Sequence, residues 1–89
     1  MNIRWIVDQR GSLYGRFDHG ARIMQRIKQQ MRTADGWQRL APDQQEALEM
    51  IAHKIGRILN GDPNHVDSWV DIAGYATLIV NKLEGGNEA

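Results

Sequence analysis

The chain contains no cysteine. This absence excludes disulfide bonds, thiolate chemistry and zinc sites built on cysteine. An excess of either charge is also missing, because 11 lysines and arginines balance 11 aspartates and glutamates and the formal net charge is zero. A neutral chain has no overall field to attract nucleic acid or an anionic membrane. We therefore do not expect nucleic-acid binding, and any charged ligand has to be held by local groups.

Long apolar runs are missing as well. No segment approaches the roughly 20 apolar residues that span a bilayer, and the first residues, MNIRWIVDQRG, hold only a short apolar island. We expect no membrane association and a location in the cytoplasm. At 89 residues the chain makes one small domain, near the lower size at which a chain alone buries enough apolar surface to be stable. Homo-oligomerisation is therefore expected.

Apolar residues recur at helical spacing in most of the chain, and no strand pattern of useful length is present. The sequence predicts an all-α domain of three to four helices, with main helices at 18–34, 43–60 and 64–83. Residues 1–17 are expected to be irregular, their apolar cluster forming a short strand or helix, because glycine and serine interrupt any period. Residues 84–89 are polar and glycine-rich and are expected to fray.

Capping residues predict where the helices end. Gly36 is placed to end the first main helix in a left-handed turn, and Trp37 is expected to fill the corner after it. Pro42 suits the first turn of the second helix, and Asp62 is the expected N-cap of the third.

The helix predicted at 64–83 has an apolar side that is expected to face the core. Its members are Val66, Trp69, Ile72, Ala73, Ala76, Ile79, Val80 and Leu83. The opposite side carries Asp67, Asp71, Gly74, Tyr75 and Leu78. A glycine inside a helix costs about 1 kcal/mol relative to alanine, so we expect a backbone or a ligand to approach this side closely.

Two pairs of carboxylates could form a magnesium site. Glu46 and Glu49 are three residues apart on one predicted helix, and Asp67 and Asp71 are four apart on the next, so each pair projects in one direction. Mg²⁺ prefers oxygen ligands and takes a few carboxylates together with substrate phosphates. The alternative is that both acid-bearing sides face water.

Lys54 and Arg57 could neutralise phosphate beside these acids. Alternatively, they form surface ion pairs with the same acids, which contribute little to stability. The basic stripe of the first main helix could contact nucleic acid, but few aromatic residues accompany it and a solvated face is the simpler interpretation.

Tyr14 and Gly15, Trp37 and Leu40, and the block QQEALEMIAHKIGRILNGDPNHVDSWVDIAGYATL resemble a family of small proteins of tailed bacteriophages and prophages. The hallmark of that family is EALxMIxxKIxRILxGxPxxxDxWxDIAGYAxL, and the likeness covers residues 10–80. This resemblance implies a phage or prophage origin and hence the cytoplasm of a host cell.

The chain is also similar, more distantly, to MazG-like all-α nucleotide pyrophosphohydrolases. Shared features are an early YG, a K-x-x-R pair in a central helix and a D-x-x-x-D-x-x-x-Y segment that opens the last helix. Those enzymes bind Mg²⁺ through E-x-x-E and E-x-x-D motifs and cleave nucleoside triphosphates to monophosphate and pyrophosphate. Glu46 and Glu49 match the first motif, whereas Asp67 and Asp71 depart from the second by one residue in spacing.

The function implied by this resemblance is a Mg²⁺-dependent phage protein that binds nucleotides or hydrolyses their pyrophosphate bond. The expected metal ligands are Glu46, Glu49, Asp67 and Asp71, and the expected nucleotide-binding residues are Lys54, Arg57 and Tyr75. The alternative is a non-catalytic phage protein that binds and modulates a host or defence-system protein.

Overall fold

The computed structural model describes residues 3–85 and is helical, with no strand in that range. Its elements are α1 (Ile3–Tyr14), α2 (Phe17–Thr33), the 3₁₀ helix η1 (Asp35–Arg39), α3 (Pro42–Asn60) and α4 (Val66–Leu83). The predicted all-α class is confirmed. None of the helices in this described range has the length and hydropathy that a membrane crossing requires.

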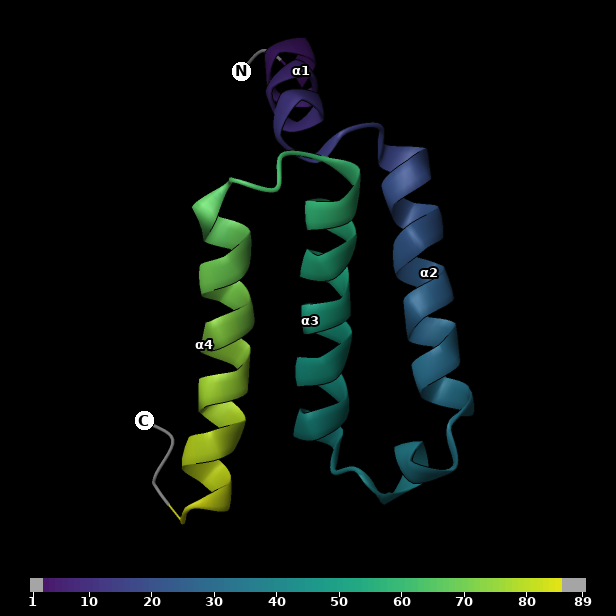
Figure 1. Cartoon of the computed structure of the whole chain (residues 1–89), viewed down its shortest axis with the longest axis vertical. Helices are drawn as coiled ribbons and strands as arrows, with labels where there is room; N and C mark the ends of the chain where they lie inside the picture. Colours follow the sequence, from purple (N-terminus) through teal and green to yellow (C-terminus); the bar gives the residue numbers. More distant parts are fainter. Residues whose placement is uncertain (1–2, 86–89) are drawn as a thin grey trace.

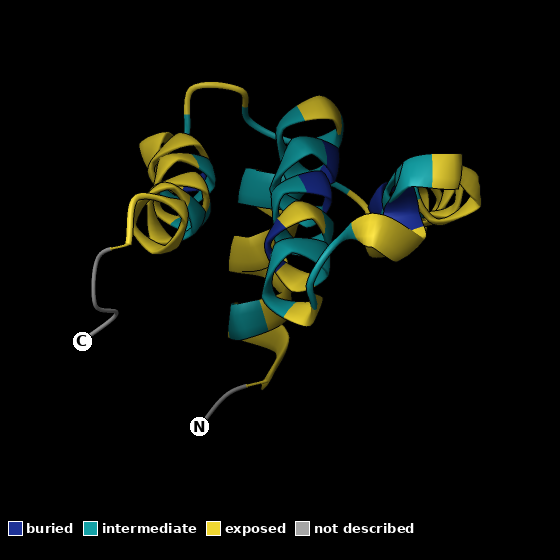
Figure 2. Cartoon of the chain, turned by 90° about the horizontal axis from the view of Figure 1, so that it is seen from below, coloured by how far each residue is buried: buried dark blue, intermediate teal, exposed yellow. Residues whose placement is uncertain are grey.

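The three long helices lie side by side in one layer, with α3 between α2 and α4 (Figure 1). Short connections make neighbouring helices antiparallel. Viewed along the helices, the layer forms a row (Figure 2). Helix α1 packs against α2 and α3 at one end of the layer. The body has principal extents of 44 × 31 × 25 Å.

Helix α1 corrects the prediction for the N-terminal segment. Residues 3–14 form a continuous helix rather than an irregular stretch. The helix ends at Tyr14, before Gly15, whose φ is 76°. The half-buried residues Ile6, Leu13 and Tyr14 recur at helical spacing, but Gly11 and Ser12 between them hide that period. Glycine in a helix costs about 1 kcal/mol, and residues 3–14 are helical nonetheless.

The boundaries of the other helices differ from the prediction in two places. Gly36 does not adopt a left-handed conformation; it lies within η1, which continues from the end of α2 and buries the side chain of Trp37 as expected. Asp62 is not the N-cap of α4, because its carboxylate accepts the N–H of Asn64 (2.9 Å) and the helix begins after His65. Residues 86–89 of the predicted tail lie outside the described residues.

The orientation of α4 also differs from the prediction. Ser68 is buried and Ile72 and Ile79 are half-buried, so these residues mark the side packed on α3. Trp69 and Leu83, expected in the core, are 54% and 70% exposed. Because apolar residues occupy most of the circumference of α4, periodicity alone does not select the buried side.

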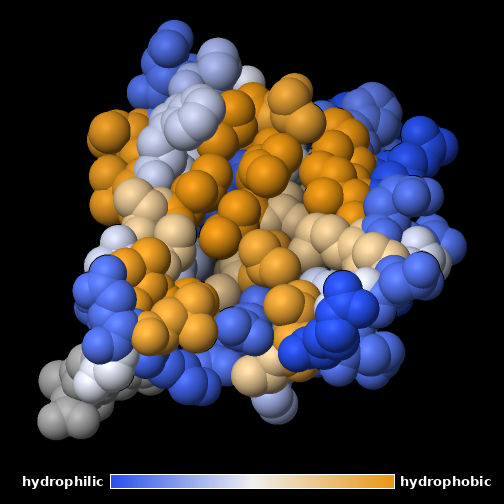
Figure 3. Space-filling model, turned by 60° about the horizontal axis from the view of Figure 1, so that its bottom comes forward, coloured by the Kyte–Doolittle hydropathy of each residue, from blue (hydrophilic) through white to orange (hydrophobic). Residues whose placement is uncertain are grey.

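The flat layer leaves little of the molecule buried. The buried apolar residues of the described chain are Trp37, Ala47 and Ala52, and no large side chain there is fully buried. One broad face of the layer is strongly apolar (Figure 3). On the other face, α1 covers the end of the layer and encloses a cavity.

Candidate functional site

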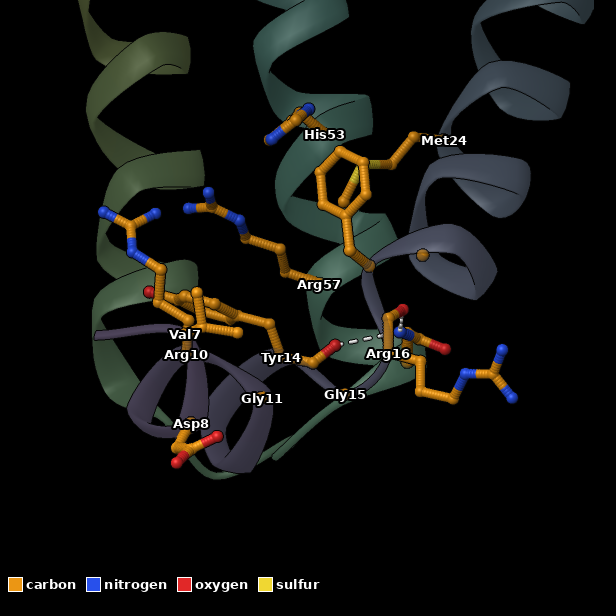
Figure 4. A pocket seen from close by; sticks show the side chains of 13 residues that line it. Val7, Asp8, Arg10, Gly11, Tyr14, Gly15, Arg16, Met24, His53 and Arg57 are labelled. Atoms are coloured by element: carbon orange, nitrogen blue, oxygen red, sulfur yellow. Dashed lines mark hydrogen bonds between the residues drawn. The ribbon is translucent and has the colours of Figure 1, made fainter. Parts of the chain in front are cut away.

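A cavity of about 750 Å³ lies between α1, α2 and α3 (Figure 4). This volume is in the range of small-molecule sites, roughly 300–1,000 Å³. Its walls combine apolar side chains with a few cationic and amide groups. They are formed by Val7, Asp8, Arg10, Gly11, Tyr14, Gly15, Arg16, Phe17, Gly20, Met24, His53, Arg57 and Asn60.

Arg57 is the central cation of this cavity. Its guanidinium carbon lies 4.3 Å from the centre of the Tyr14 ring, a cation–π contact that holds the side chain in place. The Tyr14 ring in turn contacts His65 edge-on, with 5.8 Å between ring centres. No carboxylate of the described residues forms an ion pair with Arg57. Its positive charge is therefore available to an anion that enters the cavity.

Asn60 fixes the connection between α1 and α2, and so the position of Tyr14. Its side-chain amide donates to the carbonyl oxygens of Tyr14 (2.9 Å) and Arg16 (2.8 Å). The backbone also closes here, since the N–H of Asp62 donates to the carbonyl of Leu13 (2.7 Å). Hydrogen bonds thus link the α1–α2 connection to the α3–α4 connection. The YG pair could be noted from the sequence, whereas Asn60 was missed, since its only signal is its place in the segment LNGDPN.

His53 lies on the α3 wall of the cavity. Burial of the imidazole, together with the positive charges of Lys28, Arg57 and Lys54, lowers the pKa of His53 below its usual 6.5. Its Nδ1 is 3.5 Å from the ammonium nitrogen of Lys28. The ammonium can donate a hydrogen bond to Nδ1 only when Nδ1 carries no proton. Both effects favour the neutral imidazole.

The shifted pKa of His53 predicts a pH dependence of stability. As pH falls through 6.5, the histidine of the unfolded chain gains its proton before that of the folded chain, so the free energy of unfolding should fall between pH 7.5 and 5.5. Urea titrations at several pH values measure this loss. It should shrink in His53→Gln and persist in the matched control His19→Gln, whose side chain is exposed. An identical pH dependence in wild type and His53→Gln would show that His53 is not the source of this loss of stability.

The structure does not gather the four predicted metal ligands. Glu49 pairs with Arg32 of α2, Asp71 pairs with Lys54 of α3 (3.0 Å), and Asp67 is 76% exposed beside His65. Glu46 is exposed. Across residues 3–85 no three acidic or histidine side chains are grouped to hold a metal ion. The arrangement does not fit a magnesium ion bound by all four carboxylates of one chain.

The register of α3 and α4 explains this separation. Lys54 lies opposite Asp71, and Lys82 of α4 contacts Asp43 near the start of α3. That contact also lowers the pKa of Asp43, through the hydrogen bond from Lys82. Glu46 is eight residues from Lys54 along α3, about 12 Å at 1.5 Å per residue. It therefore lies more than two turns away from Asp71.

The predicted nucleotide-binding residues are also divided. Arg57 lines the cavity, but the Lys54 side chain is only 12% exposed and faces α4, where it pairs with Asp71. Tyr75 is half-buried on α4 and is not part of the cavity wall. The aromatic residue that lies beside Arg57 is Tyr14 instead.

The fold and the cavity define a small all-α protein with a ligand-sized pocket at one end of a single helical layer. The chain belongs to the family described as "Domain of unknown function (DUF6378)", which matches residues 3–82. No match was found among curated proteins or among solved structures.

Proposed function

We propose that the protein binds a nucleotide in the cavity between α1, α2 and α3. The observation that carries this proposal is Arg57, a cation without a carboxylate partner in the described chain, held over the Tyr14 ring inside a cavity of about 750 Å³. A nucleotide joins the two chemical groups that such a site selects, an aromatic base and an anionic phosphate.

The apolar wall suits the base. Tyr14, Phe17 and Met24 line the cavity, and Phe17 is 87% exposed in the free protein. An exposed aromatic ring at the mouth of a cavity can stack on a planar ring, and a thioether makes favourable contacts with aromatic groups. The base would cover Phe17 and remove its apolar surface from water.

The cationic wall suits the phosphates. Arg10 and Arg57 both line the cavity, and in Figure 4 both side chains extend toward the α4 side of it. Guanidinium groups bind phosphate oxygens in a bidentate manner. The likeness of the YG pair and of Arg57 to MazG-like pyrophosphohydrolases supports the same ligand class.

Binding is the part of this function that the geometry supports best. Hydrolysis of a pyrophosphate bond requires a metal ion or a base that activates water. The cavity wall holds one carboxylate of the described chain, Asp8, and the acids of α3 and α4 are dispersed. Magnesium-dependent hydrolysis is therefore proposed only as an activity to be measured beside binding.

Isothermal titration with the four deoxynucleoside triphosphates, each with and without Mg²⁺, tests the proposal. We expect Arg57→Ala to weaken binding 10- to 100-fold, about 1.5–3 kcal/mol for a charge-assisted contact. Arg26→Ala, the same change at an exposed arginine of α2 that does not line the cavity, should leave affinity unchanged. Release of pyrophosphate, followed in parallel, reports hydrolysis.

Two results would contradict the proposal. The first is that no nucleotide produces heat in either buffer. The second is that Arg26→Ala and Arg57→Ala weaken binding equally, since this would indicate attraction by general charge rather than by the cavity. Arg57→Lys adds a finer test, because it keeps the charge and loses the planar group.

A further inference from the structure

The broad face of the layer opposite α1 is apolar and uncovered by residues 3–85. Leu48 and Leu59 of α3 are 40% and 66% exposed, and both lie about half a turn around the helix from Arg57, which faces the cavity. Figure 3 shows apolar side chains gathered across a broad face, with hydrophilic side chains at its margin. We call this surface the open face.

Helix α4 contributes the other half of the open face. A groove of about 310 Å³ between α3 and α4 is lined by Leu48, Ile51 and Ala76, among other mostly apolar residues. Trp69 and Leu83 lie seven residues before and after Ala76, so they share its side of the helix. Their exposures of 54% and 70% continue the apolar surface along α4.

A second helical layer is what this fold lacks. Domains are normally built of two packed layers around one core, whereas here α2, α3 and α4 form a single layer and α1 covers only one end. The described chain accordingly buries no large side chain completely. A partner on the open face would supply the missing layer.

We propose that a second copy of this chain covers the open face and that the protein is a homodimer. The α3 and α4 stripes that form the face carry no charged side chain, so two copies can meet about a two-fold axis without burying charge. The face runs along both helices, which have 19 and 18 residues and are therefore about 27–29 Å long at 1.5 Å per residue. The apolar character is typical of obligate homodimers, whose interfaces resemble a core cut in half.

The oligomeric state tests this proposal independently of nucleotide binding, because the cavity opens on the other face. Size-exclusion chromatography with light scattering should give wild type a mass of twice 10.2 kDa. Leu48→Glu and Leu59→Glu place a carboxylate in the interface and should halve that mass. Leu78→Glu is the matched control: this leucine is 51% exposed and lies nearly opposite Ala76 on α4. Its mass should equal that of wild type.

Circular dichroism establishes that each variant is folded. Leu59 is the more exposed position, so its variant decides the result if Leu48→Glu unfolds. A wild-type mass of 10.2 kDa at every protein concentration up to the solubility limit would overturn the proposal. A different protein covering the open face would give this same result. Dimers that persist in Leu59→Glu but dissociate in Leu78→Glu would overturn it as well, by moving the interface to another surface.

Discussion

Replacement of Gly15 by alanine is expected to lower the free energy of unfolding by more than about 2 kcal/mol. The residue has a φ of +76°, a conformation that costs other L-amino acids about 1–2 kcal/mol. A Cβ atom would also lie 2.1 Å from the backbone oxygen of Asn60 and 2.9 Å from its side-chain nitrogen. A backbone oxygen at the end of α3 cannot move aside without opening the connection between the helices.

Urea unfolding followed by circular dichroism measures this loss. Gly74→Ala provides the matched control, because nothing lies within 4 Å of a Cβ at that exposed helical position; we expect it to gain about 0.5–1 kcal/mol. Equal stability of Gly15→Ala and wild type would contradict the close approach of Gly15 to the backbone of Asn60. A loss at Gly74 would reveal that something outside the chain approaches α4 there, as the sequence had led us to expect.

Asn60→Asp is expected to lower the free energy of unfolding by about 2 kcal/mol, more than the roughly 1 kcal/mol expected for Asn60→Ala. The side-chain amide donates two hydrogen bonds, to the carbonyl oxygens of Tyr14 and Arg16. A carboxylate of the same shape has no donor and would face two carbonyl oxygens. Alanine loses the bonds but introduces no repulsion.

The pH dependence of Asn60→Asp separates this explanation from simple loss of packing. Once the introduced carboxyl is protonated it can donate one hydrogen bond, so the difference from wild type should narrow as pH falls below about 4, the usual range of aspartate. Asn64→Asp makes the same charge change at an exposed residue and should alter stability little. If the loss of stability in Asn60→Asp is the same at every pH, the hydrogen bonds donated by Asn60 are not what stabilises the α1–α2 connection.

Much of the fold could be predicted from the sequence. The 3.6-residue period of α2 and α3 is strong because one side of each helix is apolar and the other charged. Proline at the start of α3 and the segment LNGDPN after it limit the helices locally, since these residues act through backbone geometry rather than through distant contacts. Helix α1 was missed because Gly11 and Ser12 interrupt its apolar period.

The candidate site could be predicted only in part. Arg57 and the Tyr14–Gly15 pair were noted from the sequence, and all three line the cavity. Asn60 was missed, since an asparagine at the end of a helix is ordinary until two distant carbonyl groups are brought to it. The magnesium dependence and the phage association stay predictions.

The sequence by itself determined the all-α class, the segments that form α2, α3 and α4, and the neutral, cysteine-free chemistry, because each depends on composition or on neighbours within one helix. Tertiary structure decided which side of α4 is buried and which charges meet. The register between antiparallel helices places Lys54 opposite Asp71. It thereby keeps the carboxylate pair of α3 apart from that of α4, which the sequence had suggested could meet. The arrangement of the helices also leaves the apolar open face uncovered, because one layer of helices cannot bury both of its sides.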